Sequence, residues 1–152
     1  MSELVVYFSR SNVTKKLAEA IADELDADIE GIESKVDYSG KIGYMRGGKD
    51  AISAKIIDLG PLKYDPADYD VVYLGAPVWA GKAANPMISY IKQNEGSFKD
   101  VKLFVTAGGS GFDGALSQME EYVGKAPLKT LSLTTKEVKR DEFEDKLHSF
   151  LE

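Results

Sequence analysis

The 152-residue sequence contains no cysteine. This absence excludes disulfide bonds, thiolate nucleophiles, cysteine-ligated iron–sulfur clusters and thiolate zinc sites. It also excludes a cysteine phosphatase, a class of enzyme that uses a phosphate-binding loop on an α/β fold. There is a single histidine, His148, near the C-terminal end, where a histidine is far more often a solvated helix residue than a ligand or a base. We therefore expect no metal site and no catalytic residue.

Long apolar runs and a surplus of basic charge are also missing. No stretch approaches the roughly 20 apolar residues of a membrane-spanning helix, and no basic stretch precedes an apolar segment at the N-terminus, as it would in a signal peptide. We therefore expect a cytoplasmic protein that does not bind membranes. The net charge of -6 argues against nucleic-acid binding and permits docking to a basic protein partner.

Short apolar runs rich in β-branched and aromatic residues predict strands at five places along the chain. These runs cover residues 4–8, 29–32, 70–75, 101–106 and 128–133. Helical patterns separate most of the runs, and such alternation implies a mainly parallel sheet that is covered on both faces. Because no repeat, linker or low-complexity tract interrupts the pattern, residues 1–152 are predicted to form a single α/β domain.

The helical patterns consist of apolar residues that recur every three to four positions. They predict helices after Thr14, around Met119 and around Leu147. Another helix is predicted to begin at Asn85-Pro86, with the asparagine as the N-cap and the proline at the first helical position. The stretch 34–60 contains several glycines, and it predicts a broken helix over about 40–53.

The first predicted strand ends in a loop of hydroxyl and amide side chains, Ser9-Arg10-Ser11-Asn12-Val13-Thr14. A helix follows at once, and its unpaired N–H groups and dipole form a site for an anion. The loop lacks the glycine patterns that bind dinucleotides and nucleotide triphosphates, and its hydroxyl donors suit a terminal phosphomonoester. The alternative is a turn rich in serine and asparagine in which Thr14 is an ordinary helix cap.

Two more loops leave strands at the same edge of the predicted sheet, where open α/β sheets bind their ligands. The loop after the third strand carries Pro77, Val78 and Trp79, and the loop after the fourth strand is rich in glycine and carries Phe112. Together the three loops could hold a phosphate and enclose a planar heterocycle. Each loop alone has a simpler explanation in packing or turn formation, so it is their occurrence at one edge that favours a ligand site.

The three loops resemble those of the flavodoxin family. Residues 9–14 resemble its phosphate loop, [ST]-x-[ST]-x-x-T, while residues 75–81 and 106–111 resemble its two flavin-flanking loops. The resemblance covers essentially the whole chain in length, order and spacing. It implies a flavodoxin-like three-layer α/β/α sandwich with a five-stranded parallel sheet of order 2-1-3-4-5, and FMN bound without a covalent link.

The resemblance also implies which residues bind the FMN. The phosphate would lie among Ser9, Arg10, Ser11, Asn12, Val13 and Thr14. One side of the isoalloxazine would be flanked by Pro77, Val78, Trp79, Ala80 and Gly81. The other side or the pyrimidine edge would be flanked by Ala107, Gly108, Gly109, Ser110, Gly111 and Phe112. Phe112 stands where many flavodoxins have a stacking tyrosine, so the resemblance leaves the stacking partner open.

As a function, the resemblance implies a low-potential electron carrier, a monomer that docks transiently with a reductase and an electron acceptor. The flavin would carry the redox chemistry and the protein would set its potentials. An FMN-dependent NAD(P)H or quinone reductase is the alternative, because the fold alone does not separate the two functions. A phospho-receiver module would need a carboxylate where Gly75-Ala76 stand, and a flavin-free scaffold would leave the three loops unexplained.

Overall fold

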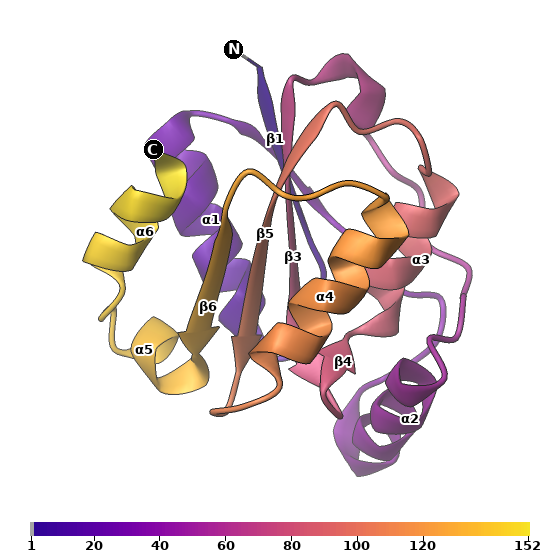
Figure 1. Cartoon of the computed structure of the whole chain (residues 1–152). Coiled ribbons are helices and arrows are strands. Elements are labelled where there is room, and N and C mark those ends of the chain that lie inside the picture. Colours follow the sequence, from indigo (N-terminus) through magenta and orange to yellow (C-terminus); the bar gives the residue numbers. More distant parts are fainter. Residues whose placement is uncertain (1) are drawn as a thin grey trace.

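The computed structural model describes residues 2–152, which form a parallel sheet with helices on both faces (Figure 1). The main strands are β1 (Glu3–Tyr7), β2 (Asp28–Gly31), β3 (Val71–Trp79), β5 (Asp100–Ala107) and β6 (Thr130–Thr134). Their order across the sheet is β2-β1-β3-β5-β6, and each neighbouring pair is parallel. The predicted order 2-1-3-4-5 of five parallel strands is therefore confirmed.

A sixth strand, β4 (Lys82–Ala83), was not predicted from the sequence. It runs antiparallel to the end of β3, with Val78 opposite Ala83 and Trp79 opposite Lys82. The two residues between them, Ala80 and Gly81, have φ angles of 52° and 79°. Positive φ at both central residues is the mark of a type I′ hairpin turn. The hairpin extends β3 past the edge of the sheet and carries Trp79 with it.

Six helices and one short 3₁₀ turn surround the sheet within the described residues. They are α1 (Val13–Leu25), α2 (Gly40–Ile52), η1 (Pro66–Asp68), α3 (Asn85–Gln93), α4 (Phe112–Val123), α5 (Thr135–Lys139) and α6 (Glu144–Leu151). The predicted broken helix is one continuous helix, α2. The short helix α5 was missed, and a capping box between Thr134 and Glu137 starts it.

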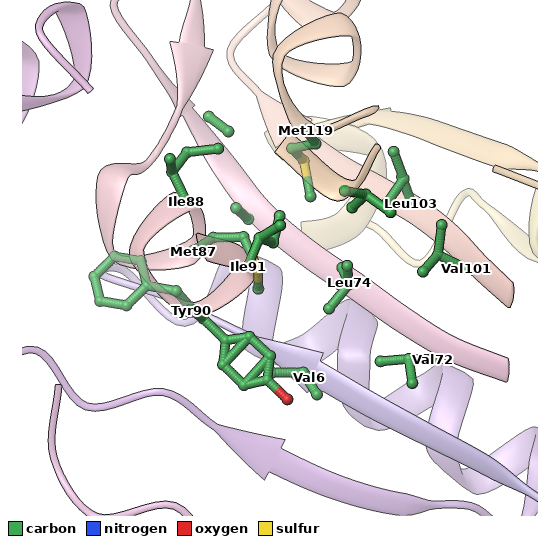
Figure 2. Close-up of a cluster of buried hydrophobic side chains, with 14 of the residues drawn as sticks. Val6, Val72, Leu74, Met87, Ile88, Tyr90, Ile91, Val101, Leu103 and Met119 are labelled. Atoms are coloured by element: carbon green, nitrogen blue, oxygen red, sulfur yellow. The ribbon is translucent and has the colours of Figure 1, made fainter. Parts of the chain in front are cut away.

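Successive side chains of each strand lie on opposite faces of the sheet, so the strands contribute to two hydrophobic cores, one on each face. On one face, the strands pack against α3 and α4, whose side chains lie over the sheet in Figure 2. Labelled members of this core are Val6, Val72, Leu74, Met87, Ile88, Ile91, Leu103 and Met119. On the opposite face, α1, α5 and α6 cover the strands through Leu17, Ile21, Val138, Leu147 and Phe150. Two covered faces give the predicted three-layer arrangement.

Two local predictions were wrong. Asn85 is not the N-cap of α3, because Ala84 holds that position and the Asn85 amide donates hydrogen bonds to the Tyr38 hydroxyl at 3.1 Å and the Lys55 carbonyl at 3.0 Å. The buried amide thus serves two distant segments instead of its own helix end. Leu128 lies two residues before the start of β6 and its side chain is exposed, although its N–H donates to the Val101 carbonyl of β5 at 2.8 Å.

None of the helices in residues 2–152 has the length and apolar character needed to cross a membrane.

Candidate functional site

The loop between β1 and α1 presents the start of a helix at the carboxyl edge of the sheet. Asn12 is the N-cap, with a φ of 67° in the left-handed region that asparagine adopts more readily than most residues. Its side chain makes no capping hydrogen bond within residues 2–152. The first N–H groups of α1 have no partner inside the helix, so they and the exposed Ser11 and Asn12 can bind an anion.

The hydroxyl group of Ser9 is further evidence for an anion site at this loop. Its Oγ is buried and has no hydrogen-bond partner among the described residues. Leaving such a group unpaired costs about 1–3 kcal/mol. A phosphate oxygen beside the loop would remove this cost, so the predicted phosphate loop has the chemistry that a bound phosphate requires.

The side chains of Thr14 and Val13 are buried within the protein. The Oγ1 atom of Thr14 lies 2.8 Å from Oγ1 of Thr106, and both threonines are buried. The side chain of Val13 is buried in the hydrophobic core around α1. Thr14 is therefore not an ordinary helix cap, and these two residues offer an anion mainly their backbone N–H groups.

The Arg10 side chain donates hydrogen bonds to backbone carbonyl groups outside its own loop. Its Nε donates to the carbonyl of Tyr38 at 2.7 Å, and Nη2 donates to that of Gly40 at 2.9 Å. The guanidinium also lies over the ring of Tyr44, 5.5 Å from its centroid. Arg10 thereby fastens the first loop to the segment that begins α2.

A cavity of about 230 Å³ lies next to the hairpin that carries Trp79. Its lining residues are Arg10, Gly43, Tyr44, Met45, Gly48, Val78, Trp79 and Ala80. The Trp79 ring is half-buried and meets Phe8 and Tyr38 edge-on, with centroids 5.5 and 5.2 Å away. The predicted first and second loops therefore meet at one cavity. Its remaining walls come from α2, which the sequence did not assign to the site.

The loop after β5 closes against the same hairpin. A Cβ at Gly111 would lie 2.9 Å from Cγ1 of Val78 and 3.2 Å from Cα of Gly81, so only glycine permits this contact. Gly108 and Gly109 face open space, since a Cβ at either would meet nothing within 4 Å. All three predicted loops thus converge, and the glycine loop leaves room beside them.

The other predicted residues of these two loops occupy less open places. Ala107 is buried at the end of β5, Pro77 is half-buried within β3, and Ser110 is exposed. Phe112 is the first residue of α4 and packs against the core under that helix. Trp79 packs against the same core, but it also lines the cavity and Phe112 does not, which makes Trp79 the better candidate to contact a planar ligand.

Comparison with known proteins agrees with this geometry. The sequence matches the family model described as flavodoxin over residues 2–150. The chain belongs to the flavodoxin family. No curated protein matches it in a sequence search.

Several solved structures have a similar fold, and the similarity covers nearly the whole chain. A flavoprotein of Lactobacillus acidophilus NCFM in complex with FMN is 24% identical, with a TM-score of 0.77 over 97% of this chain and 98% of its own. A protein of Bacteroides uniformis, assigned as a flavoprotein by inference, is 24% identical, with a TM-score of 0.78 over 93% and 97% of the two chains. An NADH:FMN oxidoreductase in its apo form is 13% identical, with a TM-score of 0.61 over 99% and 87%. At these identities the likeness establishes the flavodoxin fold.

On this flavodoxin fold, a buried polar network holds α2 beside the cavity. The Tyr38 hydroxyl donates to Asp50 at 2.8 Å and accepts from the Asn85 amide at 3.1 Å. Burial, helped by the hydrogen bond to Asp50, raises the pKa of Tyr38 to about 12, so the phenol stays protonated and can keep donating. The network explains how a helix rich in glycine keeps a fixed place.

A pattern in the sequence could have indicated that α2 packs beside the cavity, although the resemblance to a family did not. Gly43 and Gly47 are four residues apart, which places them on one face of a helix. Small residues at that spacing allow close approach to a neighbouring element. Within residues 2–152 there is no group of three or more His, Cys, Asp or Glu side chains that could hold a metal ion.

Proposed function

We propose that this chain binds FMN without a covalent link and carries electrons between redox proteins, at low potential and as a monomer in the cytoplasm. The single observation that carries the proposal is that the three predicted loops lie together: the first holds an unpaired buried Ser9 hydroxyl, the first and second border a cavity through Arg10 and Trp79, and the third packs on the second at Gly111. Membership of the flavodoxin family supports it. So does the neighbour from Lactobacillus acidophilus, which was crystallised in complex with FMN.

Each part of the cofactor would have its own partners in this site. The phosphate would be held by Ser9, Ser11, Asn12 and the first N–H groups of α1. The ring system would lie by Trp79 and Ala80, with the open glycine loop at Gly108 and Gly109 beside it. When bound, FMN would supply the redox chemistry.

The protein's task would then be to bind the ring, exclude water and set its affinity for electrons. The side chains of Val78, Trp79 and Met45 present apolar walls to the cavity. A poorly hydrated environment disfavours a charged form of a bound group, by the same effect that shifts a pKa. Apolar walls would therefore lower the potential at which the cofactor gains negative charge.

The proposal is tested by reconstituting the protein with FMN and titrating it anaerobically with dithionite while recording absorbance. We expect stoichiometric binding and reduction in two separated one-electron steps, as an electron carrier requires. Failure to bind FMN would contradict the proposal. Reduction in one two-electron step would favour the alternative function.

That alternative is an FMN-dependent NAD(P)H or quinone reductase, and the fold similarity to an NADH:FMN oxidoreductase is the observation behind it. A reductase needs room for a second substrate beside the ring. Steady-state oxidation of NADH or NADPH with a quinone acceptor distinguishes the two functions. Turnover that saturates with the pyridine nucleotide would favour the reductase, and its absence would favour the carrier.

A further inference from the structure

Helix α2 packs onto the molecule through its smallest side chains. The buried members of the helix are Gly43, Gly47, Asp50 and Ala51. A Cβ at Gly43 would lie 2.1 Å from the carbonyl carbon of Tyr38, and one at Gly47 would lie 3.0 Å from the Trp79 ring. The inner face therefore has no space for large residues, which is the reverse of an ordinary amphipathic helix.

The large apolar side chains of the segment 42–56, which runs from α2 into the loop after it, are exposed to solvent. Five of the six large hydrophobic residues that are exposed in residues 2–152 belong to it, and their exposed fractions are 75% for Ile42, 69% for Tyr44, 74% for Met45, 66% for Ile52 and 47% for Ile56. In Figure 1, α2 stands at the lower right, beside β4 and outside the layers that cover the sheet. Exposed large apolar residues gathered on one segment are typical of interaction sites.

The exposed charges on the same segment are all of one sign. Between residues 38 and 57 the exposed charged side chains are Lys41, Arg46, Lys49 and Lys55, and the one carboxylate, Asp50, is buried. The nearest exposed carboxylates along the chain, Asp37 and Asp58, lie outside the two ends of this stretch. We use the name α2 face for the five exposed apolar residues and these four basic ones. It is basic on a chain whose net charge is -6.

The α2 face is continuous with the candidate cofactor site. Tyr44 and Met45 belong to the face and also line the cavity beside Trp79. A shallow groove of about 570 Å³ continues along the outside of the helix, lined by Ile42, Met45, Arg46, Lys49, Asp50 and Lys55. A protein seated on the face would thus lie against the wall of the cavity.

Building on the proposed electron-carrier function, we propose that the α2 face is the docking surface for the redox partner, and that this partner presents an acidic surface with an apolar centre. Charge complementarity and continuity with the cavity carry this proposal. The net charge of the whole chain permits a basic partner, but the four basic side chains of the α2 face favour an acidic one at this face.

Two other occupants fit the charges less well. A second copy of the chain that paired α2 face to α2 face would place four basic side chains against four of the same sign. Because the α2 face is positive, the remainder of the molecule carries more negative charge than the net value of -6. An anionic membrane next to the face would also be repelled by that remainder. A protein partner covers only the face, and salt screens charges that lie more than about 10 Å away, so it gains the attraction with less of that repulsion.

The kinetic test uses the FMN-loaded protein, reduced, and two one-electron acceptors of known charge, acidic plastocyanin and basic cytochrome c. We expect electron transfer to plastocyanin to slow as salt is added, because attraction between opposite charges is screened. Lys41→Glu/Lys49→Glu should lower that rate about tenfold at low salt, while transfer to cytochrome c should accelerate. Ile42→Ser/Ile56→Ser should slow transfer to plastocyanin at every salt concentration.

The matched control is Lys92→Glu/Lys99→Glu, which makes the same change in net charge with two exposed lysines at the amino end of the strands. Its rate with plastocyanin should stay within about twofold of the parent at low salt. Equal slowing by the two double variants, or a rate for the parent that rises with salt, would overturn the proposal.

A second readout does not depend on FMN. Carbodiimide cross-linking of the protein to plastocyanin joins lysines to carboxylates in contact, and mass spectrometry identifies them. We expect links at Lys41, Lys49 and Lys55, and links confined to Lys92, Lys99 or Lys125 would overturn the proposal. Sedimentation with phosphatidylglycerol vesicles that Lys41→Glu/Lys49→Glu abolishes would assign the face to a lipid surface instead. Loss of FMN binding alone would contradict the proposed function and leave the cross-links to decide this inference.

Discussion

The side-chain oxygens of Thr14 and Thr106 lie 2.8 Å apart at the buried junction between the start of α1 and the end of β5. This hydrogen bond joins the first loop of the site to the strand that leads into the glycine loop. Two backbone segments that would contact different parts of the proposed cofactor are thereby held at a fixed separation.

Breaking this pair on one side should destabilise the protein. In Thr106→Val the Thr14 hydroxyl loses its partner in a buried place, and we expect a loss of about 1–3 kcal/mol in the free energy of unfolding. The double variant Thr14→Val/Thr106→Val removes both polar groups and should cost less than the sum of the single changes. Urea unfolding of the four proteins measures the coupling, and strictly additive losses would contradict the hydrogen bond.

Removal of the unpaired Ser9 hydroxyl should weaken FMN binding without destabilising the free protein. A hydrogen bond to a charged group contributes about 1.5–3 kcal/mol, so Ser9→Ala should raise the Kd for FMN by roughly tenfold to a hundredfold. Riboflavin, which lacks the phosphate, serves as the control and should bind both proteins equally. Fluorescence titration gives both constants, and an equal loss of riboflavin affinity would show that Ser9 does not act on the phosphate.

Two glycines of α2 should respond in opposite ways to the same substitution. Gly43→Ala would force the helix away from the Tyr38 backbone and should lower the free energy of unfolding by at least about 1–3 kcal/mol. Gly48→Ala adds a Cβ where nothing lies within 4 Å, so its better helix propensity should stabilise the protein by about 0.5–1 kcal/mol. Chemical denaturation compares them, and similar losses in both variants would contradict the packing of α2.

Loss of the Arg10 guanidinium should loosen α2 locally. In Arg10→Ala the carbonyls of Tyr38 and Gly40 lose their donors, and α2 loses its link to the first loop. We expect faster amide hydrogen exchange over residues 38–52, with the exchange of β3 and β5 unchanged. Mass spectrometry of proteolytic peptides measures this, and unchanged exchange in α2 would show that Arg10 does not hold the helix.

The capping box of α5 should make a small contribution to the free energy of unfolding, and this contribution should depend on pH. The hydrogen bond from Lys146 at 2.7 Å and those at Thr134 lower the pKa of the Glu137 carboxyl. A carboxyl whose pKa is lowered by folding stabilises the protein above its unfolded pKa, and that stability is lost as pH falls through the folded pKa. Glu137→Gln should cost less than about 1 kcal/mol at neutral pH, and nothing at a pH below the folded pKa. An equal loss at both pH values would contradict the ion pair.

The fold was predictable because its signals are local. Buried parallel strands are short apolar runs, and the strands around Val72 and Leu103 are recognisable without knowledge of their neighbours. Strand β4 was missed because a strand of two residues has no pattern of its own. The role of Asn85 was misassigned because its partners, Tyr38 and Lys55, are far away in the sequence.

The candidate site was predictable for a related reason. Each of its three loops directly follows a recognisable strand, and the sheet brings strand ends together. The walls that α2 provides depend on how a glycine-rich helix lies against Trp79, which is a property of packing. The same holds for the hydrogen bonds that Arg10 makes and for the packing of Phe112, since both depend on residues far away in the sequence.

The sheet order also bears on when the site forms during synthesis. The loops that build it follow β1, β3 and β5, while β6, α5 and α6 come later in the chain and lie away from the cavity. On the ribosome, every residue that lines the candidate site is therefore made before the last strand and the last two helices. Synthesis of the whole set of site residues thus precedes that of α5 and α6, which complete the core on the opposite face of the sheet.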